Sequence, residues 1–268
     1  MKVIRLTHPS GSTAEVHTYG AHVTSWIPAG AGEALFLSRA AKFEPGTSIR
    51  GGVPIIFPQF ADTGPLPKHG FARTEVWERV DGSDSAVTLR LRDSERTRAI
   101  WPHAFLLELS VELDERQLAV RMTVTNTGDE PISWTGALHT YLRVADAHRA
   151  TVHGLRAISY RDKLRDGQTF VEEDAELRIP EEIDRVYVSA PHELRVRDDA
   201  GNRTLLVRAE GFADAVVWNP GAEGAAAFPD MEAGEAREML CVEAAQATDP
   251  VRLAPGETWR GAQVLELA

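Results

Sequence analysis

Apolar and polar side chains alternate along much of this chain, and that period of two residues restricts its fold more than any other feature. Residues 117–126 show the alternation most clearly. The apolar positions there are Leu118, Val120, Met122 and Val124. A period of two places alternate side chains on opposite faces of a β-strand, whereas an amphipathic helix needs a period of about 3.6. Residues 104–113 precede a turn at 114–116, so we expect a hairpin here.

Short segments of the same kind recur along the sequence, separated by Gly, Pro, Asp and Asn. The other expected strands are 3–7, 13–18, 20–26, 86–91, 132–143, 150–160, 193–198, 204–209, 214–218, 238–245 and 260–267. Helical signal is limited to one turn near 94–99 and a short piece within 231–238. Many short strands with turn signals between them predict an all-β sandwich or barrel. No internal repeat or linker divides the chain, so we expect one domain over residues 1–268.

Two segments, 44–72 and 219–236, are rich in Gly and Pro and lack a regular pattern. Long irregular loops on a β scaffold commonly carry binding and catalytic residues. We therefore expect the functional site to draw on both segments.

The charge balance limits the partners. Asp and Glu number 40 and Lys and Arg 29, a formal net charge of −11. This balance argues against a nucleic-acid partner, and an anionic substrate would need a local cationic cluster. Cys241 is the only cysteine, which excludes an intramolecular disulfide and favours a reducing compartment. No apolar run suits a signal peptide or a membrane span, so we expect a cytoplasmic protein without a membrane partner.

A basic cluster lies at the end of the first irregular segment. Lys68, His69 and Arg73 fall within six residues, and Arg50 is followed by the pair Gly51-Gly52. Arginine binds phosphate through two parallel hydrogen bonds, and lysine acts as a point charge. Spacing alone favours a surface loop with solvated charges, and a phosphate site is the alternative.

His139 lies in a segment where residues 138, 140, 142 and 144 are mostly apolar and suit a core. On a strand, His139 would then point to the opposite face, beside Tyr141. It could donate a proton if that face lines a cleft. A lone histidine is more often an ordinary hydrogen-bonded side chain of the sheet.

Glu243 interrupts an otherwise apolar strand at 239–245. A buried carboxylate requires a partner or a cavity, so Glu243 is either one half of a structural ion pair or a general base whose pKa is raised by burial. Cys241, in the same strand, reads as a buried structural thiol. No zinc spacing, P-loop or dinucleotide fingerprint is present, and we expect neither a metal nor a cofactor.

Ten segments, taken in order, extend over nearly the whole chain. They are 20–26, 50–54, 68–73, 101–103, 126–128, 138–141 (Leu-His-Thr-Tyr), 184–187 (Asp-Arg-Val-Tyr), 217–220, 241–243 (Cys-Val-Glu) and 253–257. Together they resemble the aldose 1-epimerase-like superfamily, and within it the D-hexose-6-phosphate mutarotases.

The resemblance implies a large antiparallel β-sandwich, the galactose-mutarotase-like supersandwich, with few short helices. It places the catalytic histidine on His139 and the catalytic glutamate on Glu243. It places the substrate contacts on Arg50, Lys68, Arg73 and Asp184. Relatives often carry glutamine at the position of Lys68. His69 belongs to the same motif, and we expect it to line the pocket rather than donate the proton.

The activity implied by this resemblance is interconversion of the α and β anomers of a hexose 6-phosphate, with glucose 6-phosphate as the expected substrate. Glu243 would act as base and His139 as acid, and a nearby Glu243 carboxylate is expected to favour protonated His139. We expect a monomer. The alternatives are an epimerase of unphosphorylated aldoses and a non-catalytic carbohydrate-binding protein.

Overall fold

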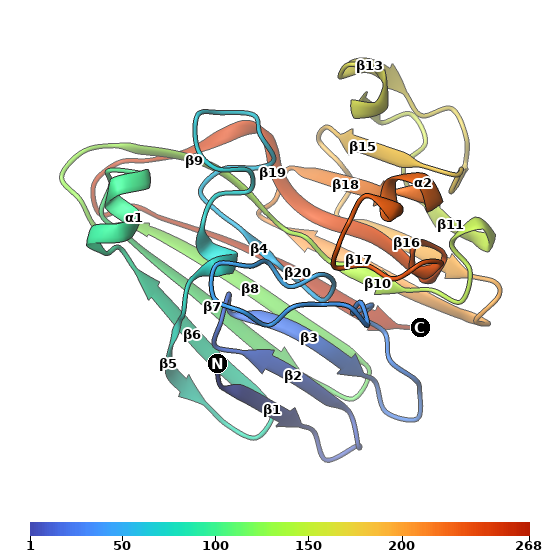
Figure 1. The fold of residues 1–268 in the computed structure, drawn as a ribbon, viewed down its shortest axis with the longest axis horizontal. Helices are drawn as coiled ribbons and strands as arrows, with labels where there is room; N and C mark the ends of the chain where they lie inside the picture. Colours follow the sequence, from blue (N-terminus) through green and yellow to red (C-terminus); the bar gives the residue numbers. More distant parts are fainter.

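Antiparallel strand pairing builds this protein, as the two-residue period predicts. The computed structural model describes residues 1–268 and contains sheets of nine, eight and three strands (Figure 1). The paired strands in all three sheets are antiparallel. The chain is therefore all-β, and the predicted fold class is confirmed.

The nine-stranded sheet contains the predicted hairpin of 104–126 near its centre. In spatial order its strands are β14 (Glu176–Arg178), β11 (Ala150–His153), β16 (Glu193–Asp198), β17 (Arg203–Glu210), β20 (Thr258–Leu267), β8 (Gln117–Asn126), β7 (Phe105–Leu113), β6 (Ala86–Arg92) and β5 (Glu78–Gly82).

The eight-stranded sheet carries the candidate functional site. Its path is β13 (Gln168–Val171), β12 (Ser159–Asp162), β15 (Ile183–Tyr187), β18 (Asp214–Asn219), β19 (Met239–Leu253), β9 (Ile132–Leu138) and β4 (Ile55–Ile56), with β10 (Tyr141–Arg143) pairing β19 beside β9. The third sheet, at the N-terminus, consists of β1 (Val3–Thr7), β2 (Thr13–His17) and β3 (His22–Ile27).

The apolar side chains of the alternating pattern fill the space between the sheets. In β8, the four apolar positions of the sequence pattern are at most 1% exposed. The main core is one contiguous cluster of 55 buried residues that draws on all three sheets. A single contiguous core supports our proposal that residues 1–268 form one domain.

Helical segments are few and short. The turn expected near 94–99 is α1 (Glu95–Ile100), which Ser94 caps by accepting a hydrogen bond from the Thr97 N–H. Of the piece expected within 231–238, only η4 (Glu235–Glu238) is helical, and α2 (Gly221–Ala226) was not predicted because its composition is mostly Gly and Ala. The remaining 3₁₀ turns are η1 (Ala72–Thr74), η2 (Ala147–Arg149) and η3 (Lys163–Arg165). None of the helices has the length and apolar character that crossing a membrane requires.

The strand expected over 132–143 is interrupted at His139 and Thr140. β9 ends at Leu138, the His139 N–H donates to the Pro54 carbonyl at 3.0 Å, and β10 begins at Tyr141. The alternation survives the interruption, because Leu138 and Leu142 lie in the main core. The hydrogen bond at this break joins the segment to Pro54, which precedes β4. His139 remains on the face opposite the core.

Candidate active site

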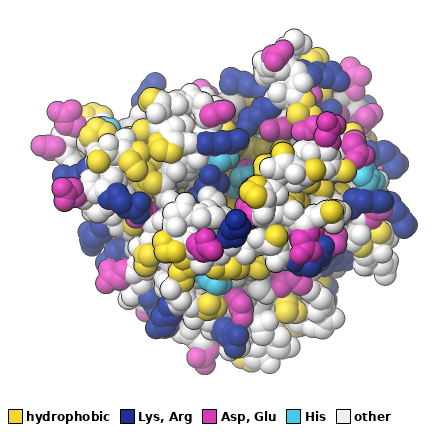
Figure 2. All heavy atoms as spheres, viewed as in Figure 1, with side chains coloured by type: hydrophobic (Ala, Val, Ile, Leu, Met, Phe, Trp, Pro, Cys, Tyr) yellow, Lys and Arg dark blue, Asp and Glu magenta, His cyan; other side chains and the backbone are white.

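All seven residues that the sequence predicted for the site line one cavity of about 350 Å³. The lining residues are Arg50, Phe60, Lys68, His69, Arg73, His139, Tyr141, Lys163, Asp184, Val216, Trp218, Phe228 and Glu243. They come from β10, β15, β18, β19, the His139 break, the 3₁₀ turns η1 and η3, and the segments 44–72 and 219–236. Figure 2 shows Lys, Arg and His side chains gathered at a hollow near the centre of the face seen in Figure 1.

Glu243 lies in the middle of β19, opposite Val216 of β18. Its neighbours Val242 and Ala244 point into the main core, so Glu243 must point to the cavity side. The side chain is only 2% exposed, and its Oε2 atom has no hydrogen-bond partner. An unpartnered buried carboxylate oxygen is costly, which is typical of a group kept for a ligand.

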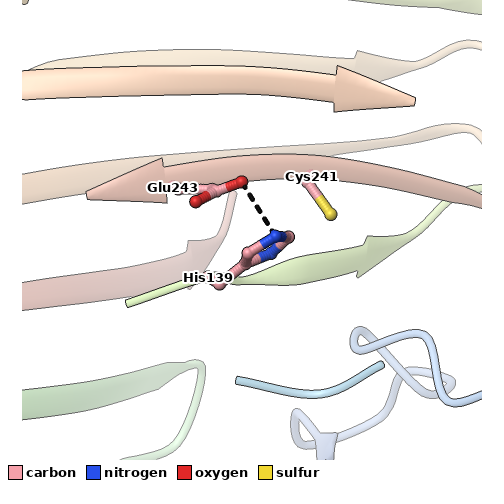
Figure 3. A group of neighbouring side chains, drawn as sticks. All are labelled: His139, Cys241 and Glu243. Carbon is pink, nitrogen blue, oxygen red and sulfur yellow. Dashed lines mark ion pairs between the residues drawn. The ribbon is translucent and has the colours of Figure 1, made fainter. Parts of the chain in front are cut away.

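His139 faces Glu243 across the sheet. Its Nε2 atom lies 3.3 Å from Oε1 of Glu243, as the dashed line in Figure 3 shows. The imidazole stacks on the Tyr141 ring, with centroids 4.9 Å apart, and lies nearly perpendicular to the Trp218 ring, with centroids 5.8 Å apart. These aromatic rings hold the imidazole in place, while its Nδ1 atom has no hydrogen-bond partner.

Burial sets the protonation of this pair. Loss of solvent, together with the charges of Arg73 and Arg50, lowers the pKa of His139 to about 3. Loss of solvent also raises the pKa of Glu243 well above its usual value, against the opposing charge of Lys163. The surroundings of the free site therefore shift both groups toward their uncharged forms. The expectation that Glu243 holds His139 protonated was wrong for the free protein, because burial and the arginines outweigh one neighbouring carboxylate.

Arg50 is held firmly at one side of the cavity. Its Nε and Nη2 atoms donate to Oδ1 of Asp230 at 3.2 Å, and its Nη1 donates to the Tyr141 hydroxyl at 3.3 Å. The guanidinium lies 4.3 Å from the centre of the Phe228 ring. Asp230 thus compensates much of the charge of Arg50 while fixing its direction.

The glycine pair after Arg50 is required by the backbone. Gly51 and Gly52 both have positive φ angles, and a Cβ atom on either would overlap a backbone carbonyl, that of Phe36 or of Val23. The close approach lets the Gly52 carbonyl accept the Tyr141 N–H at 2.9 Å. Gly51 and Gly52 therefore fix the position of the Arg50 backbone relative to that of Tyr141.

Arg73 and Lys68 are the uncompensated cations of the cavity. Neither side chain is within ion-pair distance of a carboxylate, and Arg73 donates from Nη2 to the Lys68 carbonyl at 3.1 Å. Burial lowers the pKa of Arg73 from its very high ordinary value, and its charge remains. Two unpaired positive charges side by side suit an anionic group.

His69 lines the cavity as a neutral hydrogen-bond donor. Its Nδ1 atom accepts the Ala61 N–H at 3.2 Å, which leaves the ring hydrogen on Nε2. Burial, with the nearby charges, keeps the pKa of His69 far below its usual value. Its ring meets that of His139 edge-on, at 5.7 Å between centroids.

Asp184 and Lys163 form an ion pair in the lining of the same cavity. Nζ of Lys163 lies 3.8 Å from Oδ1 of Asp184 and 4.8 Å from the centre of the Phe60 ring. Burial raises the pKa of Asp184, and the charge of Lys163 partly offsets that rise. Sequence reasoning missed Lys163, although the chain has only four lysines and two of them line this cavity.

Three aromatic side chains were also missed, Phe60, Trp218 of β18 and Phe228 of the loop after α2. Their segments were marked only as a family-like motif and an irregular loop, so no local signal distinguished them. One group of side chains has the donors to hold a metal ion, namely His139, Cys241 and Glu243, whose donor atoms lie within 4.8 Å of one another.

Comparisons with known proteins cover the whole chain. The aldose 1-epimerase family matches residues 2–266. A protein of Cenchrus ciliaris that bears the provisional name glucose-6-phosphate 1-epimerase is 40% identical over 261 residues, covering 92% of this chain and 79% of that protein. The Escherichia coli K12 protein with the same provisional name is 32% identical, covering 100% and 91%. The crystal structure of a provisionally named mutarotase from Salmonella typhimurium superposes with a TM-score of 0.90 at 32% identity, covering 99% and 90%.

Proposed function

The chain belongs to the aldose 1-epimerase family, and from that premise we propose that it is an isomerase that interconverts the α and β anomers of a hexose 6-phosphate. Glucose 6-phosphate is the expected substrate, as in the provisional names of two relatives. The observation that carries the proposal is the pair His139–Glu243, 3.3 Å apart in a cavity that also holds two unpaired cations.

Anomer interconversion requires that one proton is removed from the sugar and that another is donated to it. A base takes the proton of the C1 hydroxyl while an acid protonates the ring oxygen, so the C1–ring-oxygen bond breaks and C1 becomes an aldehyde. Rotation about C1–C2 presents the other face of the carbonyl, and the reverse transfers close the ring. We assign the base to Glu243 and the acid to His139. Each positioned transfer typically contributes ~10²–10⁴-fold.

The phosphate of the substrate would prepare this pair. In the free protein, Arg73 and Arg50 add to burial in disfavouring a charged imidazole. A bound dianionic phosphate neutralises those cations, so the pKa of His139 rises and the proton moves from Glu243 to His139. The substrate therefore generates the carboxylate base and the imidazolium acid together.

We assign the remaining side chains to different parts of the sugar phosphate. We assign the phosphate to Arg73 and Lys68, which have no carboxylate partner, with the fixed Arg50 beside them. Asp184 accepts from sugar hydroxyls, and the neutral His69 donates from Nε2. An aldose without phosphate would leave the two cations unpaired, which is why we favour the phosphorylated substrate.

The test is NMR exchange between the anomers of glucose 6-phosphate, measured with and without the protein and repeated with glucose and galactose. We expect strong acceleration for glucose 6-phosphate alone. Faster exchange of glucose or galactose would make the protein an epimerase of unphosphorylated aldoses. Binding without acceleration would make it a non-catalytic carbohydrate-binding protein. A monomeric state, a cytoplasmic location and the absence of a nucleic-acid partner stay predictions from the sequence.

A further inference from the structure

Three potential metal ligands converge beside the cavity; His139 and Glu243 line it, and Cys241 is buried next to them. Cys241 and Glu243 are two residues apart on β19, so their side chains share a face. Cys241 also pairs with Tyr141 of β10, two residues after His139. The nitrogen, sulfur and carboxylate donors consequently lie within 4.8 Å of one another, and Figure 3 shows the sulfur directed to the same side as the imidazole.

The separations suit a tetrahedral ion. Zn²⁺ binds imidazole nitrogen and carboxylate oxygen at about 2.0–2.2 Å and thiolate sulfur at about 2.3 Å. Two tetrahedral ligands at such distances stand about 3.3 Å apart, which is the distance between Nε2 of His139 and Oε1 of Glu243. A side-chain adjustment of about 1 Å would bring in the sulfur. The cavity supplies space for water as a fourth ligand.

These donors are free to bind. Oε2 of Glu243 has no hydrogen-bond partner, although the side chain is 98% buried. Cys241 is fully buried, and the acid–base chemistry does not use it. The carboxyl group of Glu243 therefore presents Oε1 to the imidazole, while its unpartnered Oε2 is turned away from Cys241 (Figure 3).

Deprotonation of the ligands offsets the repulsion between the metal ion and the surrounding cationic side chains. A bare divalent cation would be repelled by Arg50, Arg73, Lys68 and Lys163. On binding, the Cys241 thiol loses its proton to solvent as the sulfur–metal bond forms, and the proton held by the His139–Glu243 pair is also released. The ion with one thiolate, one carboxylate and a neutral imidazole is then uncharged. Binding of the metal ion therefore adds no net positive charge next to the cationic side chains.

From this geometry we propose that His139, Cys241 and Glu243 form an inhibitory site for a borderline or soft divalent cation such as Zn²⁺. The bound ion occupies Nε2 of His139 and the carboxylate of Glu243, so neither group can transfer a proton. Thiolate and imidazole ligands select Zn²⁺, Cd²⁺ and Co²⁺ over Mg²⁺ and Ca²⁺. The site needs no sugar, so it stands independently of the proposed substrate.

The unique cysteine makes the site easy to observe. We would titrate the whole protein with Cd²⁺ and follow the ultraviolet charge-transfer absorbance of the cadmium–thiolate bond. One Cd²⁺ per chain with that absorbance is expected, and Mg²⁺ should not compete. Because Cys241 is the only cysteine, no other side chain can give this signal. Absence of the absorbance at millimolar Cd²⁺ would overturn the proposal.

Inhibition is tested with matched variants. Cys241→Ser keeps the size of the side chain and lies outside the catalytic and binding machinery, so its anomerisation activity should equal that of the wild type. Zn²⁺ should inhibit the wild type reversibly, with recovery on chelation, and should inhibit Cys241→Ser at least ~10-fold more weakly. Equal Zn²⁺ sensitivity in the two proteins would overturn the proposal. If Cys241→Ser does not fold, Glu243→Gln replaces it, and its Cd²⁺ affinity should fall at least ~10-fold.

Discussion

Nε2 of His139 lies 3.3 Å from Oε1 of Glu243, and each residue keeps another buried polar atom without a partner. The two residues belong to segments far apart in the sequence, which meet because β9 and β10 both pair with β19. A structural ion pair would be expected to satisfy its remaining polar atoms. The incomplete hydrogen bonding here favours a pair kept for proton transfer.

Glu243→Gln should remove the base while preserving the fold. We expect anomerisation of glucose 6-phosphate to fall by ~10²–10⁴-fold. The temperature of unfolding should not fall, because the amide is neutral and the wild-type carboxyl has an unpartnered oxygen. His139→Asn should give a similar loss, and the double variant should lose little more, since the two residues act as one unit. Full activity in either single variant would refute the assignment.

Replacement of Lys163 or Asp184 should shift the pH profile in opposite directions. The charge of Lys163 lowers the pKa of Glu243, and that of Asp184 raises it. The base must be ionised, so the acidic limb of kcat/KM for glucose 6-phosphate should move to higher pH in Lys163→Met and to lower pH in Asp184→Asn. Lys163→Arg keeps the charge and serves as the control. Acidic limbs that move in the same direction in Lys163→Met and Asp184→Asn would contradict the predicted effects of these charges on the pKa of Glu243.

Arg73→Ala should distinguish phosphorylated from free sugar. A charge-assisted hydrogen bond contributes about 1.5–3 kcal/mol, so KM for glucose 6-phosphate should rise by ~10–100-fold. The KM for free glucose should change little. Arg161→Ala, which changes the net charge equally but lies outside the cavity, is the control. Equal changes for both sugars would mean that Arg73 does not bind the phosphate.

Phosphate should also act on the rate, because we expect it to move a proton from Glu243 to His139. Inorganic phosphite supplied in solution should therefore accelerate the anomerisation of free glucose by the wild-type protein. The acceleration should disappear in Arg73→Ala. The measurement is NMR exchange of glucose across a phosphite series, with chloride at equal ionic strength as the control. No acceleration at any phosphite concentration would limit the phosphate to a binding role.

His22 should contribute to loss of stability in acid. It is completely buried, with Nε2 2.7 Å from the Gly51 carbonyl, and burial lowers its pKa to about 3. The unfolded chain binds the proton with a pKa near 6.5, so the unfolded state gains protons first as pH falls, and stability declines between pH 6.5 and 3. Between pH 7 and pH 5, the wild type should lose about 2 kcal/mol more than His22→Gln. Denaturant unfolding at the two pH values measures the difference. Parallel losses would show that His22 is protonated in the folded protein.

Local patterns predicted the fold well because strand periodicity is a local property. The alternation in residues 117–126 defines which side chains of β8 reach the core, whatever the neighbouring strand. The same reasoning placed His139 opposite the core. It did not reveal the break after Leu138, which arises from the hydrogen bond between the His139 N–H and the distant Pro54 carbonyl.

The sequence by itself determined the all-β class, the faces of the strands and the identity of the candidate acid, base and cations. Only the tertiary structure decided how these groups act. Pairing of β9 and β10 with β19 set the distances among His139, Cys241 and Glu243, and the path of the chain brought Lys163 to the cavity and Asp230 to Arg50. It also decided the direction in which the pKa of each residue of the pair is shifted, since burial and the summed charge of neighbours from many segments control a pKa. The physical reason is that periodicity acts between adjacent residues, whereas electrostatics and strand register depend on residues that only folding brings together.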